Sequence, residues 1–129
     1  MSACDDCLRR TWLVAALAGR LQRVGGPPVV RALLALDDAE LLAALAGGER
    51  GAPIRAGHRA FDPAEARERC RTSGLEAACR CDGAYPAVLR DLEAVPAVLH
   101  ATSLPALAAA TAEPAVAIVG ARRASTYDS

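Results

Sequence analysis

The feature that most constrains the fold is an uninterrupted apolar run at residues 115–119, which reads Ala-Val-Ala-Ile-Val and ends at Gly120. Successive side chains of a strand point to opposite faces, so a run without a polar position has to be covered on both sides, as in a parallel sheet. Short strand and helix patterns alternate before it, which is typical of an α/β layer. We therefore expect residues 115–119 to form a buried strand of an α/β fold.

Two strand patterns and two helix patterns precede this run. Residues 75–81 and 95–101 are expected to be strands, and a short helix opened by Tyr85-Pro86 is expected between them. Residues 104–111 are expected to be helical.

The beginning of the chain carries helix patterns alone. Apolar side chains recur at three- and four-residue steps over residues 5–24, which predicts a helix, and Gly25-Gly26-Pro27-Pro28 ends it. A second, short helix is expected over residues 29–36. Alanine makes up much of the 53% hydrophobic fraction, which includes one Trp, one Phe and two Tyr, so the expected core consists of Leu, Val and Ala.

Two further helices carry their own start signals. Asp37 and Asp62 each stand three residues before a glutamate, which is the spacing of a helix cap. The first of these helices is expected to end at Gly47-Gly48 and the second at Gly74. The stretch 49–59 between them is polar and aperiodic, and we expect it to be a linker.

These patterns set the expected domain organisation. A chain of 129 residues has room for one domain, or for a small domain and part of another. We expect a small helical domain at 1–48, a linker and helix at 49–69, and the start of a Rossmann-like domain at 70–129. The expected fold class is α/β.

The charge balance excludes some classes of partner for the chain as a whole. Fifteen basic residues, all of them arginine, balance fifteen acidic ones, so no net field attracts nucleic acid or membrane. No apolar run approaches the roughly 20 residues that span a bilayer, and the start lacks the basic region of a signal peptide. We expect a cytoplasmic protein with no membrane partner, whose five cysteines stay reduced.

The end of the apolar run is a candidate phosphate site. Gly120 permits close approach of the backbone to an anion, and Arg122 offers a bidentate contact to phosphate. Ser125 is placed to cap the next helix or to donate to a phosphate oxygen. The alternative is a tight strand exit with solvated arginines, and the spacing alone does not decide between the two.

A longer array surrounds this site. It reads Tyr85-Pro86-x-x-Leu89-x-x-Leu92-x-x-x-Pro96-x-Val98-Leu99, followed by Ala117-Ile118-Val119-Gly120-Ala121-Arg122-x-x-Ser125-x-Tyr127. In order and spacing, over residues 82–127, the array resembles the DNA-processing protein A (DprA/Smf) family. The helical segment, with Cys-x-x-Cys-Leu-Arg-Arg near its start, more loosely resembles high-GC Gram-positive members. In the family such regions form a small sterile-alpha-motif-like or helix-hairpin-helix-like domain.

The resemblance implies a function as well as a fold. It implies an extended Rossmann domain that binds single-stranded DNA without strong sequence preference and helps to load a RecA-type recombinase during natural transformation (competence). The full-length family forms homodimers. Carried over by motif, Gly120, Arg122, Arg123 and Ser125 are the expected DNA-binding residues. The resemblance implies no catalytic residue and no cofactor, so the protein is expected not to be an enzyme.

Two rival hypotheses remain at this point. A Rossmann-type nucleotide-binding or nucleoside-phosphate-hydrolysing enzyme shares the strand-to-glycine phosphate loop, and the helices of 1–48 also fit a stand-alone interaction module. Where the family continues Tyr-Gly, this chain reads Tyr127-Asp128-Ser129. From that departure we expect a truncated form of the Rossmann-like domain.

The cysteines raise the question of a metal. Cys4-x-x-Cys7 and Cys79-x-Cys81, with Cys70, supply the thiolates that zinc prefers. Against a zinc site, the Cys-x-Cys spacing is tight and the first pair lies at a predicted helix start. We expect thiols without metal.

The remaining chemically active side chains are isolated in the sequence. His58 falls in the expected linker and His100 at the edge of an expected strand. Trp12 lies on an apolar helix face, where a role in the core is expected rather than stacking on DNA. The acidic pairs at 5–6 and 37–38 are expected to serve helix starts rather than to bind metal.

Overall fold

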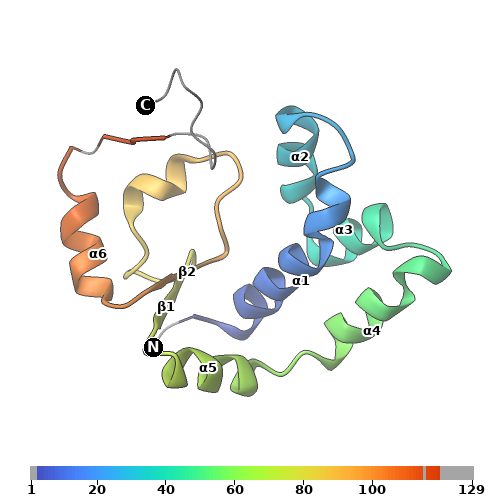
Figure 1. Ribbon diagram of the computed structural model, residues 1–129, viewed down its shortest axis with the longest axis horizontal. Coiled ribbons are helices and arrows are strands. Elements are labelled where there is room, and N and C mark those ends of the chain that lie inside the picture. The colour runs from blue at the N-terminus through green and yellow to red at the C-terminus, as the bar shows by residue number, and fades with distance from the viewer. Residues whose placement is uncertain (1–2, 115, 120–129) are drawn as a thin grey trace, which may run out of the picture.

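The computed structural model describes residues 3–114 and 116–119, which form a set of helices joined to a small sheet (Figure 1). The elements in chain order are α1 (Asp5–Leu21), α2 (Pro27–Leu34), α3 (Asp38–Leu45), the 3₁₀ turn η1 (Glu49–Gly51), α4 (Ala52–Ala60), α5 (Pro63–Thr72), β1 (Glu76–Cys79), the 3₁₀ turn η2 (Ala87–Asp91), β2 (Val98–Ala101) and α6 (Leu104–Thr111). The fold is mixed helix and sheet, and mostly helical. None of its described helices combines the length and apolar character that a bilayer crossing requires.

The helix caps expected from the sequence are confirmed. The side chain of Asp37 accepts a hydrogen bond from the backbone amide of Glu40 at 2.8 Å, at the start of α3. Asp62 accepts from the amide of Ala64 at 2.9 Å, at the start of α5. Gly74 follows α5 with a φ of 69°, a conformation that glycine adopts at little cost and that ends a helix.

The helical core is built on one face of α1. Leu13, Leu17 and Leu21 recur every four residues, so their side chains lie on the same face of the helix. They are buried together with Leu41 of α3 and Ala46. Trp12 packs against the same cluster, in agreement with the expected core role.

The expected linker at 49–59 is wrong, because this stretch forms η1 and α4. The reason is tertiary: α4 packs along α1, and Ile54 joins the helical core. The guanidinium of Arg55 donates to the carbonyl oxygens of Ala46 at 2.5 Å and Gly48 at 2.8 Å, which satisfies acceptors left at the end of α3. The contacts with α1 join residues that are distant in the chain, so the polar composition of the stretch does not reveal them.

The two described strands confirm the expected strand positions but not the expected parallel order. Strand β1 pairs with β2 in antiparallel register, with Glu76 opposite Ala101 and Cys79 opposite Val98. The connection between them contains the short turn η2 instead of a crossover helix, so the chain returns along the neighbouring strand in the opposite direction.

The expected buried strand at 115–119 is not seen in its described part. Residues 116–119 have no regular secondary structure, and Ile118 is 96% exposed. Within the described residues no strand pairs with residues 116–119. Their large apolar side chains are accordingly exposed to solvent. The Rossmann-like domain therefore stays a prediction.

Helix α1 belongs to both cores. Near its start, Cys7 and Leu8 pack with residues of the two strands, and Phe61 and Cys70 lie against them. Its remaining turns carry the helical core. Figure 1 shows α1 running from the strands towards α2 and α3. The expected domain boundaries at 48 and 70 stay predictions.

A substitution at Gly51 tests whether the close packing of η1 and α4 on α3 holds in solution. A Cβ atom at this position would overlap the backbone carbonyl group of Ala46. Gly51→Ala is expected to lower the free energy of unfolding by about 2 kcal/mol or more, because backbone has to move. Gly19→Ala is the matched control, since a Cβ there meets nothing within 4 Å. It should be neutral or stabilise by roughly 0.5 kcal/mol. Equal urea midpoints for the two variants would show that 49–59 behaves as a linker.

Candidate functional site

The four residues expected to bind DNA lie outside the described residues. They are Gly120, Arg122, Arg123 and Ser125. The candidate phosphate site therefore stays a prediction. The described part of the motif array covers residues 85–99 and 117–119.

Tyr85 joins two parts of this described array. Its hydroxyl donates to the carbonyl oxygen of Pro96 at 2.8 Å, and the residue is 2% exposed. The guanidinium of Arg90 lies 5.5 Å from the centre of the tyrosine ring, in cation–π geometry. The Tyr-Pro part of the array and the Pro-x-Val-Leu part thus form one packed unit ahead of residues 116–119.

Burial raises the pKa of the Tyr85 phenol above the ordinary tyrosine value, because the phenolate loses its solvation. The neutral phenol is also the form that donates to Pro96. Since the folded-state pKa is the higher one, this stabilisation is present below about pH 10 and is lost as pH rises through the folded pKa.

Alkaline titration of phenolate absorbance tests this packing. In the Tyr127→Phe variant Tyr85 is the remaining tyrosine, and its midpoint should be higher in the folded chain than in the same variant unfolded in urea. The reason is that burial opposes ionisation only in the folded state. The Tyr85→Phe variant supplies the control signal of Tyr127. Identical folded and unfolded midpoints for Tyr85 would contradict a buried phenol.

A cavity of about 430 Å³ lies between α1 and residues 94–98. Its walls include Val14, Leu34, Val95 and Pro96. Mainly apolar walls suit packing rather than phosphate binding. The cavity therefore does not replace the predicted site at Gly120.

A buried polar network connects α1, α3 and α4. Arg10, which is 6% exposed, donates to Asp38 at 3.1 Å and to the carbonyl oxygen of Leu34 at 2.8 Å. The Nε2 atom of His58 lies 2.8 Å from the second carboxylate oxygen of Asp38. The expectation that His58 is an isolated linker residue is wrong, because α4 places it against Asp38. This aspartate does more than mark a helix start, since both of its oxygens have partners.

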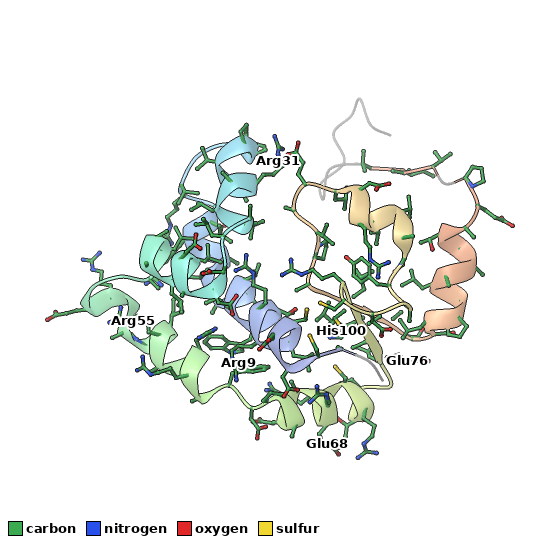
Figure 2. All side chains as sticks on the ribbon, turned by 180° about the vertical axis from the view of Figure 1, so that it is seen from behind. Arg9, Arg31, Arg55, Glu68, Glu76 and His100 are labelled. Carbon is green, nitrogen blue, oxygen red and sulfur yellow. The ribbon has the colours of Figure 1, made fainter. Side chains whose placement is uncertain are left out.

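Removal of the Asp38 carboxylate tests how much this network contributes to the free energy of unfolding. Asp38→Ala leaves the buried guanidinium of Arg10 without its counter-charge, and the expected loss of stability is on the order of 3 kcal/mol. Glu93→Ala is the matched control, because it removes the exposed partner of Arg31 (Figure 2). Its expected effect is within about 1 kcal/mol. Denaturant unfolding measures both, and equal effects would contradict a buried ion pair.

Four cysteines from two distant segments of the chain converge at one place. Cys4 precedes the first turn of α1 and Cys7 lies within it, while Cys79 ends β1 and Cys81 follows two residues later. All four sulfur atoms lie within 4.8 Å of one another. Figure 2 shows sulfur atoms gathered where α1 begins beside the strands. Cys70 lies outside this group and packs against the neighbouring core.

The sulfur atoms have close polar contacts. The Sγ atoms of Cys7 and Cys81 are 3.8 Å apart, and the backbone amide of Cys4 donates to the Sγ of Cys79 at 3.5 Å. A hydrogen bond from the backbone of Cys7 lowers the pKa of Cys4. Burial raises the pKa of Cys7.

The spacing argument against a shared site is wrong. Residues before and within the first turn of a helix can point to one side. Cys79 ends β1 and Cys81 lies in the turn that follows, where the amide of Asp82 donates to the carbonyl oxygen of Cys79 at 2.9 Å. The two tight spacings are therefore compatible with a common centre once α1 starts beside the end of β1. The sequence does not reveal that juxtaposition, because more than seventy residues separate Cys7 from Cys79 and Cys81.

Comparison with protein-family models, with curated proteins and with solved structures finds no match to this chain. Membership of the DprA/Smf family stays a prediction that rests on the motif array.

Proposed function

We propose that this sequence belongs to a single-stranded-DNA-binding recombination mediator of the DprA/Smf kind. The observation that carries the proposal is the ordered array from Tyr85 to Tyr127, with the Val-Gly-x-Arg segment at 119–122. The hydrogen bond between Tyr85 and Pro96 supports it, because the Tyr-Pro part and the Pro-x-Val-Leu part of the array contact each other.

The binding chemistry follows from the residues at the end of the apolar run. In the proposed Rossmann-like domain, residues 115–119 form a covered strand, and Gly120 brings backbone amides close to a phosphate. Arg122 and Arg123 supply adjacent positive charges, and Ser125 supports the loop. Contacts to phosphate carry no sequence information, which agrees with binding that does not depend on base sequence.

The exposed apolar segment is consistent with this proposal. Val116, Ile118 and Val119 are among the most exposed large apolar side chains of the described residues. Contiguous exposed apolar side chains of this kind mark a surface that is normally covered by protein. In the proposed function, the sheet and helices of a Rossmann-like domain cover them.

The wider role is part of the same proposal. The protein acts in the cytoplasm, as a homodimer, without catalysis of its own, and hands single-stranded DNA to a RecA-type recombinase during natural transformation. The neutral net charge implies that attraction to DNA is local rather than spread over the surface.

Salt-dependent binding of the 129-residue chain to a fluorescent oligothymidine tests this function. Two arginines that neutralise two phosphates predict a slope of log affinity against log salt of about −1.4, from roughly −0.7 per phosphate on single strands. Arg122→Ala should weaken binding severalfold and reduce the slope by about 0.7, because one phosphate contact is lost.

Arg23→Ala is the control variant for this measurement, since Arg23 is exposed and lies in the helical part of the chain. Its affinity and slope should equal those of the parent. An unchanged slope in Arg122→Ala would remove this arginine from the site. Absence of binding by the parent chain at low salt would contradict the proposed function for this sequence.

A further inference from the structure

The convergence of Cys4, Cys7, Cys79 and Cys81 has no role in the proposed DNA binding. The two pairs come from segments more than seventy residues apart, and the fold brings them to one point at the start of α1. Cys7 and Cys79 are buried, and Cys4 and Cys81 lie on the exposed side. Four sulfur donors around one point form a complete coordination set.

The distances fit one metal ion with tetrahedral coordination. A Zn–S bond of about 2.3 Å places the sulfur atoms of a tetrahedral Zn(Cys)₄ centre about 3.8 Å apart. The Sγ atoms of Cys7 and Cys81 are 3.8 Å apart, and the whole set lies within 4.8 Å. A disulfide requires sulfur atoms about 2.05 Å apart, so the Cys7–Cys81 distance does not correspond to a disulfide.

We propose that these four cysteines bind one structural Zn²⁺ ion. Four thiolates leave no open position, which is the mark of a structural rather than a catalytic zinc site. Calcium and magnesium prefer oxygen ligands and are excluded by the donor set. An iron–sulfur cluster places several atoms between its thiolates and needs them farther apart than they are here.

The surroundings suit a centre with net negative charge. Cys4 is the residue before the long helix α1 and Cys7 lies in its first turn, so both sulfur atoms are near the positive end of the helix dipole. The amide of Cys4 donates to the sulfur of Cys79, the kind of outer contact that orients a metal ligand. Arg67 of α5 donates to the carbonyl oxygen of Ala3 at 2.9 Å and so holds the segment just before Cys4.

The sheet needs such a link, because its own core is small. Besides two of the cysteines, the buried cluster beneath it consists of Ala3, Leu8, Ala77, Ala97 and Val98. An isolated two-stranded sheet is marginally stable, and small side chains bury little apolar area. A metal that joins the end of β1 to the start of α1 replaces the missing apolar contacts.

Metal analysis of the purified full chain tests the site. The parent chain should carry about one zinc per molecule, and Cys4→Ser and Cys81→Ser should each lower this content at least about fivefold, because three thiolates hold zinc less tightly. These two cysteines are the exposed members of the set, so their replacement disturbs the core least. Cys70→Ser is the matched control and should keep about one zinc per molecule.

Cobalt substitution keeps the test decisive if the serine variants fail to fold. Co²⁺ added to the metal-free parent chain should give the intense visible absorption of tetrahedral thiolate coordination at one equivalent, and Zn²⁺ should abolish it. In the zinc-loaded chain the Cys70 thiol alone should react with a thiol reagent, and all five thiols should react after zinc is removed in urea.

Three results would overturn the proposal. The first is a parent chain that holds neither zinc nor cobalt at one equivalent, and the second is loss of zinc from Cys70→Ser to the same degree as from Cys81→Ser. The third is a chain that contains iron and inorganic sulfide instead of zinc. Metal content is independent of DNA binding, so the Arg122→Ala variant should still carry about one zinc per molecule.

Discussion

Burial of two different stretches of α1 is the constraint on which the described structure depends. Leu13, Leu17 and Leu21 are buried in the helical core, while Cys7 and Leu8 are buried in the core beneath the strands. A single rigid helix therefore fixes the position of both cores relative to each other. Helices α4 and α5 follow along its length, so an element of low intrinsic helix propensity such as α4 is stabilised by contact.

Polar groups tie the same helix to its neighbours where apolar contacts are few. Arg10 is buried on α1 and is held by Asp38 and by the end of α2 through Leu34. His58 joins the network from α4. At the start of α1, the proposed zinc ion would have the same effect with stronger bonds, because it joins the helix to a sheet with a small core.

The two proposals concern different parts of the chain. The cysteine centre lies within the described fold and would act on stability, whereas the proposed DNA site begins at Gly120 and would act on function. They are connected through β2 and Tyr85, since the family-like array starts just after Cys81 and includes the strand that pairs with Cys79. A stable sheet would thus give the array its framework.

The sequence alone determined the local features of this protein. The caps at Asp37 and Asp62 and the helix at 104–111 depend on interactions between residues close in the chain, so local patterns predict them. The strand positions near 76–79 and 98–101 follow local residue preferences, although their pairing joins distant segments. The motif array that supports the proposed function is likewise a matter of order and spacing. By contrast, α4 lies in a short polar stretch that local patterns mark as a linker, and its helix is held by contacts with α1 and with the end of α3.

Tertiary structure alone decided which distant side chains meet. The antiparallel strand order, the partners of His58 and the meeting of Cys4 and Cys7 with Cys79 and Cys81 all join segments that lie far apart in the chain. Spacing within either cysteine pair argues against a shared site when each is taken alone. The packing of α1 against the end of β1 reverses that conclusion, because a coordination set is a property of positions in space.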